Sequence, residues 1–445
     1  MATDPLALLR SRSYVALLVL AGILGVPISA AAWGFLELVT VLQSQIFTHL
    51  PHALGFSKEP VWWPIPLLAI SGLLVALAIQ YLPGTGGHKP AEGFKAGGIP
   101  VPVELPGVFF AALASLALGA VIGPEAPLIA LGGGLGVLAV QLAKRDVPDQ
   151  TKAAVAAAGS FAAISTLLGS PILAAFLLME AAGLAGAVMD LVLLPGLVAA
   201  GTGSLMFVGL GTWTGLGTFS LVIPNLPRFV RPDAAEFGWA VAIGLAAALL
   251  GAGIRRLALF LQDRVEPRKL WLTPVIGLAV AGLAIAFEAG TGKGTSEVLF
   301  SGQSALGPLL AHSASYSLGA IVLLLACKGL AYSASLSSFR GGPIFPSLFV
   351  GAAGGIALSH APGLPMVAGA AMGMGAMMVA MLRLPLTSVL IATLLLLSDG
   401  LAVTPLVIVA VAITYVAVTR LAPIPPAPAT APAAPADEAV PASRT

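Results

Sequence analysis

Glu125 is the residue of this sequence best placed to do chemistry, because it is the only charged residue between Glu104 and Lys144. A carboxylate inside so long an apolar run indicates a functional site by default. It lies in the segment Gly123-Pro124-Glu125-Ala126-Pro127, and proline favours the first turn of a helix. A helix start offers free N–H groups and a partial positive charge, which bind anions. The ionised carboxylate is itself such an anion, and protonation would release it. The alternative is a capping carboxylate with a structural role.

The same pattern occurs again in the second half of the chain, at Gly342-Pro343-Ile344-Phe345-Pro346. A weaker pair of segments, Ser170-Pro171-Ile172 and Leu384-Pro385-Leu386, has a similar separation. Two related halves, each with a Gly/Pro-interrupted apolar segment, are typical of transporters whose site lies at the repeat interface. We therefore expect two helix starts to converge on one dehydrated anion. Prolines that merely kink two packed transmembrane helices are the alternative.

A third segment of this kind, Ala96-Gly97-Gly98-Ile99-Pro100, follows a loop that carries Lys89 and Lys95. Its small residues would let an anion approach the backbone closely. Glycine-proline loops are common, so this segment indicates an anion site only together with the other two segments.

Composition indicates which elements must position these segments. Of the 445 residues, 58% are hydrophobic and only 9% are charged, against about 25% charged in soluble domains. A bilayer crossing needs roughly 20 apolar residues of helix, and the charge-free runs predict about ten or more membrane segments, some of them broken helices. Lipid cannot satisfy free backbone groups, and the apolar runs do not alternate as strands of a barrel would. The sequence predicts an all-α integral membrane protein.

The chain divides into three parts. Residues 1–12 read as a short lead-in, residues 13–421 as one transmembrane domain with halves at about 60–215 and 235–421, and residues 422–445 as a disordered Pro/Ala-rich tail. Basic residues gather before the first apolar run, in 89–95, in 144–152 and in 255–269. The positive-inside rule places these segments, and with them both termini, in the cytoplasm.

Several functions find no support in the sequence. We find no nucleophile or zinc-protease motif, so an enzyme is not expected. The segment Gly290-Thr291-Gly292-Lys293 lacks the first glycine of a phosphate loop, because Phe287 stands there. The five histidines have no metal-ligand spacing, so we expect neither a metal nor a cofactor. The net charge of +2 does not suggest nucleic acid, and a single cysteine excludes an intramolecular disulfide.

The three Gly/Pro segments, in this order, resemble the signatures G-S-G-I-P, G-[K/R]-E-G-P and G-x-F-x-P of the CLC chloride channels and proton/chloride antiporters. The resemblance covers about residues 13–421. It implies a CLC-like fold of two inverted-topology repeats with broken and re-entrant helices, and a homodimer that meets at the helices after Pro171 and Pro385. It also implies transport of chloride and similar monovalent anions across the cell membrane, in contact with lipid.

The resemblance assigns roles to individual residues. Glu125 would be the gate, and the anion would contact seven further residues: Gly97, Gly98, Ile99, Gly123, Ala126, Ile344 and Phe345. The chain also departs from the family, because Gly97 stands where the family has its chloride-binding serine. The inner proton-transferring glutamate of the antiporters falls at Ala181. Glu180, one position earlier, is either part of another proton route or an end charge or salt-bridge partner.

Two transport modes remain open. Passive conduction is favoured by Ala181, which cannot carry a proton, and proton-coupled antiport would need another inner proton route. Three further basic residues in the apolar part of the chain are interpreted as helix-end charges or as a diffuse field that attracts anions: Lys328, Arg340 and Arg383.

Overall fold

Helices make up the regular structure, because a chain in lipid must satisfy its backbone groups internally. The computed structural model describes residues 10–95, 98–143, 147–183, 187–213, 223, 227–396 and 400–421. Within these ranges, strand-like pairing is limited to one isolated antiparallel bridge, between Gly123 and Gly342. The prediction of an all-α protein is confirmed. The tail 422–445 and most of the 1–12 lead-in lie outside the described residues.

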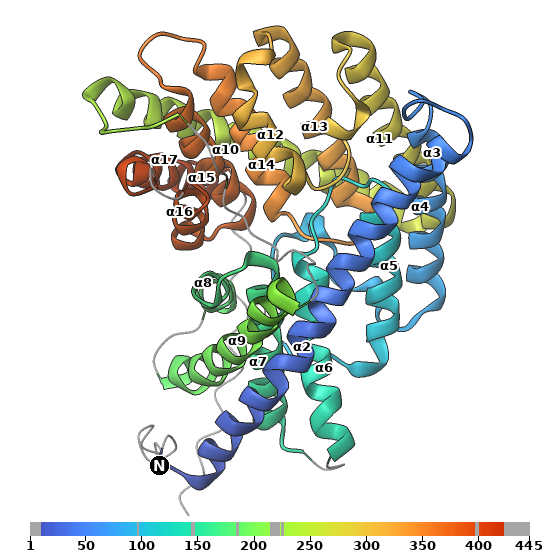
Figure 1. Ribbon diagram of the computed structural model, residues 1–445, viewed down its shortest axis with the longest axis vertical. Helices are drawn as coiled ribbons and strands as arrows, with labels where there is room; N and C mark the ends of the chain where they lie inside the picture. Colours follow the sequence, from blue (N-terminus) through green and yellow to red (C-terminus); the bar gives the residue numbers. More distant parts are fainter. Residues whose placement is uncertain are drawn as a thin grey trace, which may run out of the picture.

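The first half of the chain supplies helices of very different lengths. They are α2 (Arg12–Ser44), α3 (Leu50–Ala53), α4 (Pro64–Tyr81), α5 (Leu105–Ala117), α6 (Glu125–Ala143), α7 (Asp149–Leu168), α8 (Pro171–Ala182) and α9 (Ala187–Trp213). The long α2 crosses the molecule diagonally (Figure 1) and packs against α7 and α9. Pro171 begins α8 and the Ser170 hydroxyl caps it by accepting from the Leu173 N–H, so this predicted helix start is confirmed.

The second half follows with α10 (Ala234–Val265), α11 (Lys269–Thr291), α12 (Gln303–Ala311), α13 (Leu318–Ser338), α14 (Ile344–Leu358), α15 (Met366–Leu382), α16 (Pro385–Leu394) and α17 (Gly400–Leu421). In Figure 1 most of these helices lie above α6–α9. The halves interlock, because α4 of the first packs against α11 of the second. Pro385 begins α16 as predicted.

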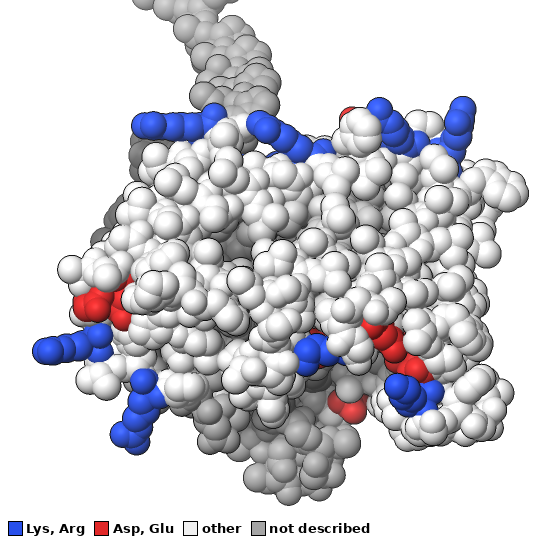
Figure 2. All heavy atoms as spheres, turned by 90° about the horizontal axis from the view of Figure 1, so that it is seen from above, with Lys and Arg blue, Asp and Glu red and all other residues white. Residues whose placement is uncertain are grey.

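The helices fit a membrane protein. Seven described helical stretches are long and apolar enough to cross a bilayer, and one of these, Ala234–Thr291, contains both α10 and α11. Six further apolar stretches have 10–17 described residues, and one of them, Leu191–Met206, is part of the longer α9. Length and composition do not show which of the shorter helices cross, so about ten or more membrane segments, some of them broken helices, stays a prediction. Figure 2 shows a broad band without charged side chains, between Lys and Arg along the upper edge and charges of both signs lower down.

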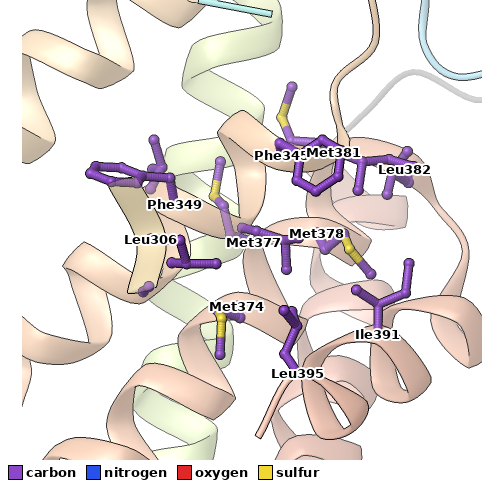
Figure 3. Packing of buried hydrophobic residues seen from close by; sticks show 14 of the residues in the cluster. Leu306, Phe345, Phe349, Met374, Met377, Met378, Met381, Leu382, Ile391 and Leu395 are labelled. Carbon is purple, nitrogen blue, oxygen red and sulfur yellow. The ribbon is translucent and has the colours of Figure 1, made fainter. Parts of the chain in front are cut away.

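The contact between α14 and α15 holds the start of α14 in place. The two backbones approach so closely that a Cβ on Gly351 or Gly355 would overlap the carbonyl group of Gly373 or Gly369. Apolar side chains of α12, α14, α15 and α16 fill the space around this contact (Figure 3), among them Leu306, Phe345, Phe349, Met374, Met377, Met378, Met381, Ile391 and Leu395. Glycine here serves close helix packing, as the sequence predicts.

We expect Gly355→Ala to lower the melting temperature of the protein in detergent. The added methyl group must push α14 and α15 apart, and overpacking of this kind destabilises proteins by about 1–3 kcal/mol. Gly354→Ala is the matched control, because a Cβ there meets nothing within 4 Å. It should leave the melting temperature unchanged or raise it, since alanine favours helix over glycine by about 1 kcal/mol. Tryptophan fluorescence during heating measures the melting temperatures. Equal melting temperatures for Gly355→Ala and Gly354→Ala would contradict this packing.

Candidate functional site

The two repeated Gly/Pro segments meet in space. The Gly123 N–H donates to the Gly342 carbonyl at 2.7 Å, and the Gly342 N–H donates back to the Gly123 carbonyl at 2.6 Å. Two residues after each glycine a helix begins, α6 at Glu125 and α14 at Ile344. The helix starts therefore lie side by side, and the interpretation of these prolines as mere kinks is wrong.

The Glu125 carboxylate occupies the space between the two helix starts. Its side chain is fully buried, and Oε1 accepts a hydrogen bond from the Phe345 N–H at 3.0 Å. Oε2 has no hydrogen-bond partner among the described residues. An acidic oxygen from the first half of the chain thus accepts from an amide at the helix start of the second half, which is a position suited to a bound anion.

Gly123 and Gly342 must be glycine for this arrangement. A Cβ at either position would overlap the Glu125 carboxylate. The pairing also changes one predicted role. Gly123 was expected to contact an anion, but its N–H is occupied by the Gly342 carbonyl, so it shapes the site and does not present a free donor.

Tyr332 is a residue of the site that the sequence did not reveal. It lies on α13, is fully buried, and its hydroxyl donates to the Pro343 carbonyl at 2.9 Å. Pro343 immediately precedes α14, so Tyr332 holds the start of that helix. A tyrosine within an apolar helix gives no sequence signal of its own, because only the fold shows what its hydroxyl reaches.

The third Gly/Pro segment reaches the site through a cavity. Gly97 lies outside the described residues. Gly98 has a positive φ of 90° with open space where a Cβ would be, and Ile99 is 38% exposed. Both line a cavity of about 980 Å³ that extends to Ala126 in the first turn of α6. No helix begins within the described part of this segment, residues 98–100, since the next helical turn is Pro102–Glu104.

Glu180 lies at a contact between the halves and caps a helix. Its carboxylate accepts from the Leu386 N–H at 2.9 Å, the Thr387 N–H at 2.7 Å and the Thr387 hydroxyl at 2.6 Å. These donors form the first turn of α16, so the negative charge neutralises the positive end of that helix. No salt bridge to Glu180 is present among the described residues. Ala181 packs against the apolar core.

The three basic residues differ in their surroundings. Arg383 ends α15 as the expected helix-end charge. Lys328 does not, because it lies within α13, is fully buried, and donates to the carbonyls of Glu297, Val298 and Leu299 at 2.9–3.1 Å. The helix-end interpretation of Lys328 is therefore wrong. Arg340 follows α13, is buried, and lines the cavity described above. The described residues hold no cluster of side chains suited to a metal ion.

Comparison with known sequences gives a consistent result. Residues 67–419 match the family model described as voltage gated chloride channel. The curated relatives include the "Putative ion-transport protein YfeO" of Escherichia coli O1:K1, 29% identical over 364 residues, which are 80% of this chain and 82% of that protein. The protein of the same name from Shigella boydii serotype 4 is 28% identical over 363 residues, with the same coverage.

Similar folds occur among solved structures. A slow cyanobacterial Cl⁻/H⁺ antiporter matches with a TM-score of 0.72 at 20% identity, over 91% of this chain and 94% of that one. A CLC-type fluoride/proton antiporter matches with a TM-score of 0.66, also at 20% identity, over 90% and 95%. These matches confirm the predicted CLC-like fold.

We expect Glu180→Ala to destabilise the protein, because three donors of α16 lose their acceptor. Removal of a helix cap typically costs about 1–2 kcal/mol, which should lower the melting temperature in detergent by a few degrees. Glu180→Gln keeps an acceptor oxygen but no charge, so its melting temperature should lie between those of Glu180→Ala and the parent protein. Asp263→Ala is the control, since Asp263 is exposed on α10. If Glu180→Ala has the same melting temperature as Asp263→Ala, the capping role is excluded.

Proposed function

Because the chain belongs to the voltage gated chloride channel family, we propose that it carries chloride and similar monovalent anions past the meeting point of α6 and α14, with Glu125 as the gate. The observation that carries the proposal is the hydrogen bond from the Phe345 N–H to Glu125 Oε1, at 3.0 Å. A backbone donor in a dehydrated place binds whichever anion reaches it. In this structure that anion is the protein's own carboxylate.

The gate works by competition. While Glu125 is ionised, its carboxylate occupies the Phe345 amide and excludes a free anion. Protonation removes the negative charge that the helix starts stabilise. The neutral side chain is then bound less strongly and can leave the site. Backbone amides without the family's serine hydroxyl select loosely, by size and charge, so bromide and nitrate should pass as well as chloride.

Passive, channel-like conduction is the favoured mode. Ala181, at the position of the antiporters' inner glutamate, has no ionisable group, and Glu180 is held by three donors of α16. Proton-coupled exchange is the second candidate, because the structures with the similar fold include a Cl⁻/H⁺ antiporter and a fluoride/proton antiporter. Coupling would need an inner proton route other than residue 181.

Orientation and assembly are part of the proposal. Lys89 pairs with Glu266, and Arg255 donates to the Glu92 carbonyl, so the basic segments 89–95 and 255–269 share one face. The positive-inside rule assigns that face to the cytoplasm, with both termini. Exposed apolar side chains on α8 and α16, such as Ile172 and Leu386, support a homodimer through these helices. Each subunit contains both helix starts and hence a complete route.

The experiment is anion flux from liposomes with Glu125→Gln. Glutamine keeps the shape of the side chain but cannot be an anion, so chloride meets no negative competitor. Flux should continue or rise, and its dependence on pH between about 4 and 8, the range in which a perturbed carboxyl group titrates, should flatten. Asp263→Asn, an exposed carboxylate on α10, should retain the pH response of the parent protein.

Simultaneous recording of pH separates the two modes. Passive conduction predicts that a chloride gradient drives no steady uphill proton movement, and antiport predicts that it does. A wild-type protein that carries cations but no anions would overturn the proposed function. If Glu125→Gln folds and its flux keeps the full pH response of the parent, Glu125 is not the gate and the capping role becomes the better account.

A further inference from the structure

The cavity of about 980 Å³ is a route toward the gate from the basic face. Its wall includes Lys95 in a basic loop and Gly98 and Ile99 of the third Gly/Pro segment. Its other end reaches Ala126 and Pro127, directly after Glu125. An anion that enters from the basic face therefore crosses this space before it meets the carboxylate.

Arg340 is the buried charge on this wall. The residue is only 6% exposed, and its place is fixed by its backbone, whose N–H donates to the Ser115 hydroxyl at 3.1 Å. Arg340 lies two residues before Gly342, and Gly342 pairs with Gly123. The backbone of Arg340 is therefore held close to the gate residue Glu125. The charge cannot move far from the inner approach to the site.

The guanidinium of Arg340 keeps donors free. Nε donates to the Thr85 carbonyl at 3.2 Å and Nη1 donates to the Phe339 carbonyl at 3.3 Å. A guanidinium has five N–H donors, so three have no partner among the described residues. No carboxylate of the described residues lies within 4 Å of it. Glu92 and Glu266 act on the guanidinium only from beyond that distance, so an anion in the cavity would supply a direct counter-ion for the buried charge.

The other charged groups on the wall are already engaged or more exposed. The Lys95 ammonium lies 3.5 Å from Glu92 and its side chain is 65% exposed. The His88 ring bonds to the Gly93 carbonyl at 2.7 Å. Glu104 is the acidic member of the lining. Arg340 is thus the buried cation of this wall with donors to spare.

We propose that Arg340 is an anion-docking residue in the inner cavity, and that its preferred ligand is a small planar oxyanion such as nitrate. The planar fork of a guanidinium matches two oxygens of a trigonal anion, whereas a spherical halide accepts no such paired contact. The inference rests on the proposed function, because it names an anion class and a second contact along the same route.

The test is nitrate and chloride binding to the purified full-length protein in detergent, measured by calorimetry. In the wild type, Glu125 fills the gate site, so binding reports the cavity. Arg340→Gln should weaken nitrate binding at least about tenfold, the loss expected for a charge-assisted contact. Arg340→Lys keeps the charge without the fork, so it should bind chloride nearly as the parent does and lose the preference for nitrate. Arg264→Gln, an exposed arginine on α10, should bind both anions as the parent does.

The outcomes separate this inference from the proposed function. Wild-type liposomes without anion flux would overturn the function, while the binding titrations still decide the role of Arg340. Wild-type flux together with unchanged nitrate affinity in folded Arg340→Gln would overturn the inference and leave the function standing. If Arg340→Gln does not fold, Arg340→Lys decides, and an undiminished nitrate preference in that variant would contradict docking through the guanidinium fork.

Discussion

Two hydrogen bonds between Gly123 and Gly342 hold together the elements on which the rest of the structure depends. The residues are 219 positions apart, yet their mutual N–H to carbonyl bonds of 2.7 Å and 2.6 Å fix α6 and α14 start to start. Glycine is required on both sides, because any Cβ would occupy the space of the Glu125 carboxylate. Close glycine contacts, of α6 with α7 and of α14 with α15, then hold each start in place.

In the proposed function, the carboxylate occupies the place in which a free anion would bind. The helix starts stabilise negative charge without regard to whether it belongs to the protein or to a free ion. The cavity next to the start of α6 carries a buried arginine with unused donors, so positive charge lines this cavity as well as the helix starts. Backbone donors discriminate weakly between anions. The planar guanidinium of Arg340 in the cavity would add discrimination by the shape of the anion.

The sequence predicted the features that depend on local pattern. Repeated prolines and glycines indicated where α6, α8, α14 and α16 begin, and an isolated glutamate in an apolar run indicated the site. Contacts between distant segments could not be predicted in this way. Whether the Gly123 N–H is free, what the Tyr332 hydroxyl reaches and where Lys328 finds its acceptors all depend on tertiary placement. Charge-free length also could not show where an apolar run divides, because hydropathy does not distinguish a full crossing from two short helices.

The most direct measurement is an experimental structure of Glu125→Gln prepared in bromide, with anomalous scattering to locate the ion. If the carboxylate occupies an anion site, bromide should appear next to the Phe345 N–H, in the place that Glu125 Oε1 holds in this structure, and the wild type should show none there at a pH where the carboxylate is ionised. A variant with the same helix starts and no bromide between them would contradict the account.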